Sequence, residues 1–257
     1  MLSWMLVVST LLAISFCFVL RGYGMNALRT ELDMESTPIY NDMIKDCLRA
    51  SKLHREHAEI EIENLMTSEL DGTRIAVFDM RQIVDSTVDR YYSNWQSVTV
   101  LLPPRHNLPV CQLYPEGIVA KIASALGAQD IDFADHVEFS DLYVLKAENE
   151  KLVRAFFKRP VLDLMAENPG WWVDINRRGI IIRPANKRMN RSQIERSMDL
   201  AVKLGGLLGR QGSLLLRSEL AEVKGLGSAA WLPQWSELAA AQNSLTSTHG
   251  DAHFAGR

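Results

Sequence analysis

The feature that most constrains this chain is its first twenty residues, MLSWMLVVSTLLAISFCFVL, which contain no charged side chain. As a helix, residues 2–20 would span about 28 Å at about 1.5 Å per residue, close to the hydrocarbon thickness of a bilayer. A cleaved secretory signal fits less well, because no basic residue precedes the run and its exit, Phe16-Cys17-Phe18, is not small-x-small. A buried helix of a soluble domain is a third alternative, which the lack of a polar face disfavours. We therefore predict a retained transmembrane anchor at residues 1–21 that contacts the lipid bilayer through residues 2–20.

The charges beside the apolar run set its expected orientation. No Lys or Arg precedes it, whereas Arg21 and Arg29 follow closely, and basic flanks stay on the cytoplasmic side. Three cysteines are too few for a closed disulfide framework, so Cys47 and Cys111 are expected to be reduced thiols. We therefore predict a single-pass protein with its N-terminus outside and its domain in the cytoplasm.

The rest of the chain has the size and composition of one globular domain. The 257 residues are 47% hydrophobic and 23% charged, which is enough to bury a sizeable core. A net charge of −3 gives no general attraction to nucleic acid, so we expect no nucleic-acid partner. The predicted divisions after the anchor are a juxtamembrane linker at residues 22–37, a domain at residues 38–216 and a flexible tail at residues 217–257.

Hydrophobic periodicity predicts an α+β domain built from hairpins. Apolar residues at helical spacing after Pro38 predict a short amphipathic helix. Strands are predicted in the alternating run AEIEIENLM, in TRIAVFDMRQIV after the Asp71-Gly72 turn, in SNWQSVTVLLPP, in LPVCQLYP and in the hairpin WWVDINRRGIIIRP. Helices are predicted at residues 116–126, at residues 150–157 behind an Asn149 N-cap, at residues 159–170 and at residues 190–209. Adjacent hairpins with grouped helices favour an antiparallel sheet packed by several helices.

The stretch QDIDFADHVEFSDLY, residues 129–143, is the first candidate for chemistry, because it gathers five acidic residues and His136. Its spacing partly matches a calcium loop, but the glycine turn and the closing glutamate of such a loop are missing. The alternation instead predicts an extended piece with Ile131 and Phe133 inward. A helical turn should follow, with Asp135 as its cap and with core contacts from Val137 and from Phe139 or Leu142. His136 and Glu138 are the pair to mutate if an activity is found.

Other constellations give weaker signals. His54 and His57 have the spacing of two ligands on one helix face, but no motif supplies a third. Cys111 has only His106 near it, and neither a phosphate-binding loop nor a nucleophile elbow occurs. The sequence therefore assigns no catalytic, cofactor-binding or metal-binding residue, and no cofactor.

A basic cluster follows the two adjacent tryptophans Trp171 and Trp172. Its members lie within fifteen residues: Arg177, Arg178, Arg183, Lys187, Arg188 and Arg191. One interpretation is a solvated hairpin face with one tryptophan in the core. The other is a surface that engages anionic lipid, with the tryptophans at the membrane interface. Near the C-terminus, Trp231 and Trp235 are expected either to form a docking motif or to cover an apolar patch of their own domain.

Several short motifs resemble those of a family of bacterial membrane-anchored proteins known only as a domain of unknown function. The matching stretches are Asp71 to Asp79, Leu113 to Glu116, Asp130 to Phe133, His136 to Ser140, Tyr143 to Leu145 and Glu150 to Phe157. The resemblance covers residues 46–205 and implies an integral protein of the bacterial inner membrane with a cytoplasmic domain. It brings no known activity or catalytic residue. Members of the family often have two hydrophobic segments, whereas this chain has one.

These observations favour an interaction or scaffolding module over an enzyme. The expected protein is anchored in the bacterial inner membrane and presents its domain to a protein partner. Two alternatives stay open: an enzyme or ligand sensor that uses the acidic residues 129–143, and a domain that engages anionic lipid through its basic hairpin.

Overall fold

A computed structural model describes residues 16, 19–37, 40–51, 53, 57–70, 72–85, 90–104, 108–116, 130–185 and 187–225. The chain divides into two compact units, Met1–Gly212 and Ser213–Arg257, and the fold below belongs to the first. Most of the predicted anchor, the predicted helix at residues 116–126, His54, His106, Trp231 and Trp235 lie outside the described residues.

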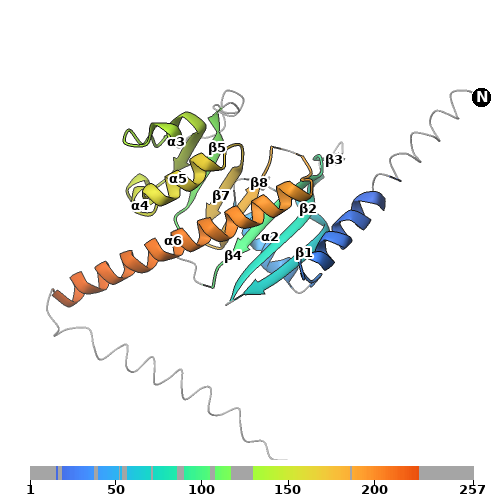
Figure 1. The fold of residues 1–257 in the computed structure, drawn as a ribbon, viewed down its shortest axis with the longest axis horizontal. Helices are drawn as coiled ribbons and strands as arrows, with labels where there is room; N and C mark the ends of the chain where they lie inside the picture. Colours follow the sequence, from blue (N-terminus) through green and yellow to red (C-terminus); the bar gives the residue numbers. More distant parts are fainter. Residues whose placement is uncertain are drawn as a thin grey trace, which may run out of the picture. The chain divides into compact units, whose positions relative to one another are not determined.

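Among the described residues, eight strands form one sheet, and every pairing between them is antiparallel (Figure 1). Their order is β1-β2-β4-β8-β7-β5-β6, with the short β3 paired to β2. The strands are β1 (Glu59–Leu70), β2 (Thr73–Asp85), β3 (Arg90–Tyr92), β4 (Gln96–Leu102), β5 (Cys111–Pro115), β6 (Tyr143–Ala147), β7 (Trp172–Asn176) and β8 (Gly179–Arg183). The predicted α+β class with an antiparallel sheet is confirmed.

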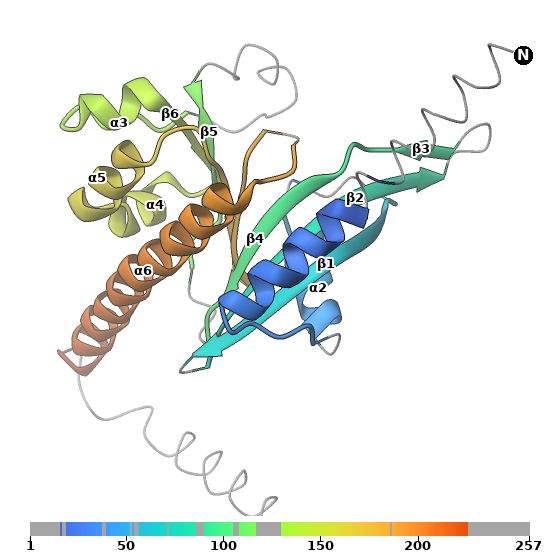
Figure 2. The same cartoon turned by 45° about the vertical axis from the view of Figure 1, so that its right-hand side comes forward.

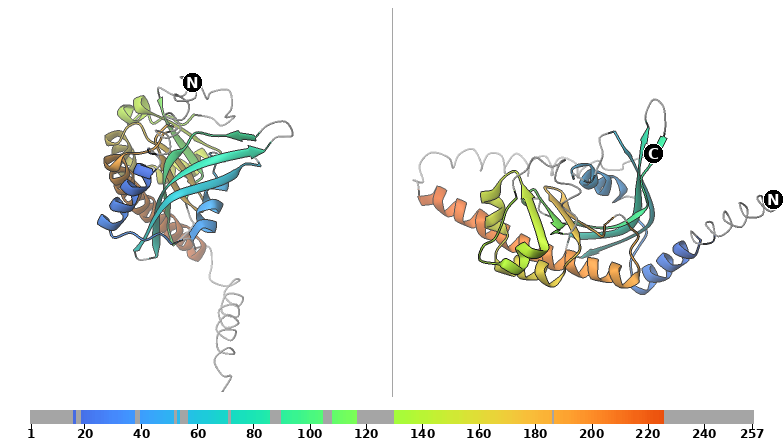
Figure 3. Two further views of the ribbon diagram at one scale, coloured as in Figure 1. Left: turned by 90° about the vertical axis from the view of Figure 1, so that its right-hand side faces the viewer. Right: turned by 90° about the horizontal axis from the view of Figure 1, so that it is seen from above.

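Helices cover the two faces of the sheet unequally (Figures 2 and 3). One face, here called the α2 face, carries α2 (Asn41–Arg49), whose Ile44, Cys47 and Leu48 enter the core. The opposite face, the α6 face, carries residues 19–31, which are helical, and the part of α6 (Arg191–Gly225) that belongs to the first unit. It also carries α3 (Val137–Leu142), α4 (Glu150–Phe156) and α5 (Arg159–Glu167).

Strand alternation sorts the side chains of the sheet between these two faces. On β4, Val98, Val100 and Leu102 join the core beneath α2. Thr99 points to the α6 face, where its hydroxyl lies 2.6 Å from that of Ser197. A Cβ atom at Gly205 would overlap with the Leu101 side chain, so glycine lets α6 approach β4 closely.

Two predicted helix starts have different outcomes. The Asn149 side chain accepts a hydrogen bond from the backbone N–H of Leu152 at 2.9 Å, which confirms it as the N-cap of α4. The prediction that Asp135 caps α3 is wrong, because His136 is the N-cap and accepts from the N–H of Phe139. The inward prediction holds for Ile131, Phe133 and Phe139 but fails for Val137, which is exposed.

The predicted linker at residues 22–37 also needs correction. Residues 19–31 form a helix, and Met25, Leu28 and Met34 are buried. Glu35 and Thr67 then exchange two backbone hydrogen bonds of 2.8 and 2.7 Å, which adds the segment to the edge of β1. At the other end, α6 continues to Gly225, so the first part of the predicted flexible tail is helical.

Candidate functional site

A buried carboxylate joins the N-terminal helix to the sheet. Asp79 lies on β2 with its side chain fully buried on the α6 face. Arg21 reaches it from the helix at residues 19–31, with Nε 2.9 Å from Oδ2 and Nη2 3.0 Å from Oδ1. This is the two-bond geometry in which a guanidinium pairs best with a carboxylate. Arg21 also donates to the carbonyl oxygen of Met189 at 2.8 Å, so one side chain joins three segments of the chain.

Two further side chains complete the shell of Asp79. The Ser97 hydroxyl donates to Oδ1 at 2.5 Å and accepts from the N–H of Met189 at 2.8 Å. Asn64 donates to Oδ2 at 3.0 Å from the bulge of β1, where its φ of 53° is left-handed. Burial alone raises the pKa of Asp79, but the bonds from Arg21, Ser97 and Asn64 outweigh it and hold that pKa below its usual value. Asp79 is therefore an ionised structural acid.

The acidic side chains of residues 130–141 do not gather into one binding site. Asp130, Asp132, Asp135, Glu138 and Asp141 are all exposed, while Ile131 and Phe133 turn inward between them. The pKa of Asp130 is raised, first by partial burial and then by the charge of Asp132. Among the described residues, no three His, Cys, Asp or Glu side chains lie close enough to hold a metal ion.

His136 is paired with Asp163 and not with Glu138. Its Nε2 lies 2.8 Å from Oδ1 of Asp163 on α5, and its Nδ1 accepts from the N–H of Phe139 at 3.1 Å. Nδ1 is thus the unprotonated nitrogen, and Nε2 carries the proton donated to Asp163. Because both ring nitrogens are occupied, the imidazole fastens α3 to α5 and has no nitrogen left to take a proton from a substrate.

The two described cysteines are buried free thiols. Burial raises the pKa of Cys47 to about 12, and its Sγ lies 3.8 Å from Oδ1 of Asn176. Burial also raises the pKa of Cys111 well above its ordinary value. Neither sulfur is a thiolate at neutral pH, so neither has the chemistry of a nucleophile.

The predicted basic cluster is divided among separate ion pairs. Arg178 lies 3.3 Å from Asp46, Arg188 lies 3.5 Å from Asp79, and Arg191 pairs with both Glu31 and Glu195. Arg183 is buried, stacks 4.2 Å from the centre of the Trp172 ring, and has its pKa lowered to about 10 by burial. Trp171 is buried in the core. The structure therefore places these cations in several environments rather than on one surface.

Arg183 belongs to a polar layer on the α2 face that the sequence did not indicate. Gln112 donates to Asp174 at 3.0 Å and accepts from the Tyr114 hydroxyl at 2.5 Å. Burial raises the pKa of Tyr114 to about 12, so its hydroxyl remains a donor at neutral pH. Arg183 donates to Gln96 at 3.3 Å. These groups satisfy one another, and the layer serves packing more than catalysis.

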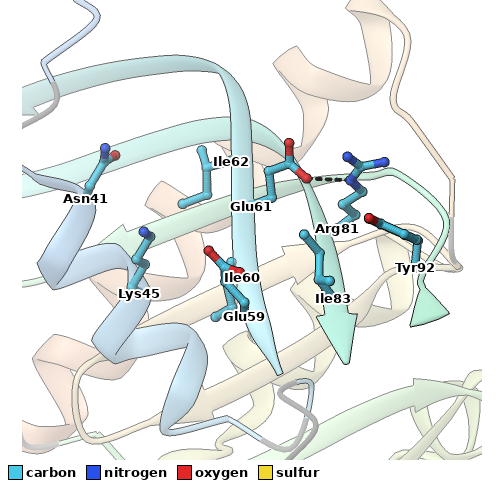
Figure 4. A pocket seen from close by; sticks show the side chains of 9 residues that line it. All are labelled: Asn41, Lys45, Glu59, Ile60, Glu61, Ile62, Arg81, Ile83 and Tyr92. Carbon is cyan, nitrogen blue, oxygen red and sulfur yellow. Dashed lines mark hydrogen bonds and ion pairs between the residues drawn. The ribbon is translucent and has the colours of Figure 1, made fainter. Parts of the chain in front are cut away.

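A groove of about 470 Å³ lies between α2 and the edge of the sheet (Figure 4). Asn41 and Lys45 line it from α2, and Glu59, Ile60, Glu61 and Ile62 line it from β1. Arg81, Ile83 and Tyr92 complete its lining. Arg81 bonds Glu61 at 2.5 Å and lies 4.8 Å from the ring centres of both Tyr92 and Trp95. This groove, beside a strand edge, is the candidate binding site of the described domain.

Sequence reasoning missed the groove, because it identified α2 and β1 without their mutual placement. The buried role of Asp79 was also missed, because Asp79 entered only as the last residue of the Asp71–Asp79 motif. The available signal was the position of Asp79, since an acid between Phe78 and Met80 in an apolar strand requires a buried partner. Arg21, the first charge of the chain, is that partner.

Comparison with known protein families, with curated proteins and with solved structures finds no match. The resemblance to a bacterial membrane-anchored family therefore stays a prediction. Within the part of the chain that the structure describes, no helix is long and apolar enough to cross a membrane.

Proposed function

We propose that this chain is a membrane-anchored interaction module of the bacterial inner membrane, with its α+β domain in the cytoplasm. The apolar residues 2–20 and the basic flank at Arg21 and Arg29 support the anchor and its orientation. The observation that carries the proposal is the bond between Arg21 and Asp79. It fixes the residue that follows the apolar run directly to the sheet, so a domain held in this way keeps one orientation relative to its anchor.

Two features favour binding over catalysis. The groups that could take part in catalysis all make structural contacts. The two thiols are buried, the imidazole of His136 makes two hydrogen bonds, and the ionised Asp79 is bonded to Arg21. The groove beside β1 is instead lined by acidic, basic and isoleucine side chains, a mixture that suits the docking of a chain segment. The described residues thus support a partner-binding role better than an enzyme centred on residues 129–143.

The experiment that tests this function is cross-linking and pull-down from detergent-solubilised membranes with the full chain. The protein should fractionate with membranes, resist extraction by high salt, and recover a protein partner in stoichiometric amount. Extraction by salt alone would contradict the anchor. Recovery of no stoichiometric partner would contradict the interaction module.

The lipid-binding alternative receives less support. Arg178, Arg188 and Arg191 already pair with carboxylates, which lowers the positive field available to anionic lipid. Flotation of the anchor-deleted protein with anionic vesicles separates the two functions, because only the lipid-binding domain would float.

A further inference from the structure

We propose that the outer edge of β1 at Ile60–Ile62 binds an extended partner segment with alternating apolar and basic residues, which pairs antiparallel as an added strand. The inference rests on the proposed interaction function and names the chemistry of its partner. Strand addition uses backbone hydrogen bonds for affinity and alternate side chains for specificity.

The edge is open to pairing in the described part of the chain. β1 is the terminal strand of the sheet, and the segment at Glu35 covers it only at Thr67, beyond the bulge between Glu63 and Met66. No described strand pairs with Ile60–Ile62 on the outer side of β1. The contact of Glu35 with Thr67 shows that this edge accepts an antiparallel segment, since it consists of two short backbone hydrogen bonds.

The backbone register identifies which groups face outward. Gln82 directs its backbone away from β1, because its N–H donates to the Ser93 hydroxyl and its carbonyl accepts from the Ser93 N–H. Ile60 is the β1 partner of Gln82, so its own N–H and C=O point to the open edge. Ile62, two residues further along, presents its groups in the same direction. The edge therefore offers two outward donor and acceptor pairs.

The side chains beside this edge define the partner. Ile60 and Ile62 belong to the α2 face, so an added strand would place apolar side chains next to them in the groove. Asn41 and Lys45 line the same groove from α2.

The other side of the edge selects for positive charge. Glu59, Glu61 and Glu63 alternate with the two isoleucines and form a row on the α6 face. Glu61 already pairs with Arg81, and Glu63 lies 3.8 Å from Arg188, so a basic residue of the partner would share each carboxylate with an arginine. The two side chains keep 36% and 41% exposure, and a carboxylate can accept hydrogen bonds from more than one donor. Basic residues of an added strand would lie directly opposite this row. A second copy of β1 would instead place glutamate opposite glutamate, which disfavours self-association through this edge.

The test uses a fluorescent seven-residue peptide of alternating lysine and valine, titrated into the detergent-solubilised full chain. We expect the lysine peptide to bind and the corresponding glutamate peptide not to bind. Ile62→Pro removes the outward N–H without breaking a bond to β2, and should weaken binding about tenfold more than Ile62→Ala, which keeps that N–H. Equal affinity of the two variants, or equal binding of the two peptides, would overturn the proposal.

A second measurement keeps the proposal testable if Ile62→Pro fails to fold. Hydrogen exchange of the wild-type chain should slow at the amides of Ile60 and Ile62 when the lysine peptide is added. The amide of Glu61, which faces β2, should not change. Protection elsewhere on the domain would place the peptide at a different surface and contradict the inference. A partner recovered by pull-down with equal yield from Ile62→Pro and Ile62→Ala would reject the β1 edge while leaving the interaction function standing.

Discussion

Asp79 shows how one ionised side chain fixes the path of the chain before the sheet begins. Its carboxylate is fully buried and accepts hydrogen bonds from Arg21, Ser97 and Asn64. A buried ion pair is costly to break from one side, because the remaining charge loses its partner. The arginine that would remain is Arg21 of the helix at residues 19–31, so loss of the ion pair would destabilise both that helix and β2.

Replacement of this carboxylate should be severe. Asp79→Asn should lower the free energy of unfolding by about 3 kcal/mol, because Arg21 would remain without its counter-ion. Thermal unfolding of the solubilised chain measures the change. Asp199→Asn is the matched control, since Asp199 forms an exposed pair with Lys203 and its loss should have little effect. Equal shifts for the two variants would contradict the structural role of Asp79.

The lowered pKa of Asp79 also predicts an acid dependence. A carboxyl group with a lower pKa when folded stabilises the fold above its unfolded pKa of about 3.9. That contribution disappears as the pH falls through the folded pKa. The wild-type chain should therefore lose stability more steeply than Asp79→Asn below about pH 4, as followed by unfolding at fixed temperature across this range. Parallel pH profiles would show that Asp79 is not an ionised acid in the folded protein.

Individual elements depend on contacts that local pattern does not reveal. α3 has six residues, and His136 just before it is its N-cap and also bonds Asp163 on α5. Short helices have little stability of their own, so such tertiary contacts decide whether they form. α6 depends instead on a close approach to β4 at Gly205.

The cap at His136 can be tested against its neighbour. His136→Ala should lower the stability of the domain by about 1 kcal/mol through loss of the cap, and should speed hydrogen exchange in α3. Glu138→Gln should change neither, because Glu138 is exposed. An effect of Glu138→Gln as large as that of His136→Ala would contradict the role of His136 as the cap of α3.

The packing of α6 makes a second prediction at this scale. Gly205→Ala should destabilise the domain by about 1 to 3 kcal/mol, because the added methyl group would overlap with Leu101. Gly206→Ala has open space and should stabilise α6 by up to about 1 kcal/mol. Chemical denaturation of both variants in parallel measures the difference. Stabilisation by both substitutions would mean that α6 does not contact β4 closely.

Sequence pattern predicted elements that carry their own periodicity. The hairpin of β1 and β2, the cap at Asn149 and the sorting of β4 side chains all follow from local spacing. The helix at residues 19–31 was missed because its buried residues Met25 and Leu28 form too short an apolar stripe. The predictions for Val137 and Asp135 failed because His136 is the N-cap of α3. The groove depends on how α2 meets β1, and no single segment contains that information.

At the scale of the whole molecule, the N-terminal helix is part of the domain. Three apolar side chains of this N-terminal region are buried, those of Met25, Leu28 and Met34. The region also reaches the edge of β1, where Glu35 pairs with Thr67. The groove for the proposed partner lies further along the same edge. The segment that follows the predicted anchor thus occupies one part of the edge and leaves another part open.

Truncation tests this integration. A chain that begins at residue 19 should fold, because it keeps Arg21 and the buried methionines. A chain that begins at residue 38 should be markedly less stable, because Asp79 loses its main counter-ion and part of the α6 face becomes exposed. Circular dichroism melts of the two purified proteins compare them. Equal melting temperatures would mean that residues 22–37 are the linker that the sequence predicts.

The bond between Arg21 and Met189 joins residues 168 positions apart. A ribosome adds roughly 5–20 residues each second, so roughly ten to thirty seconds separate the synthesis of the two residues. During that interval Arg21 has been made, while the backbone carbonyl that completes its contacts does not yet exist. The shell around Asp79 can therefore be completed only after Met189 has been made, late in the synthesis of the chain.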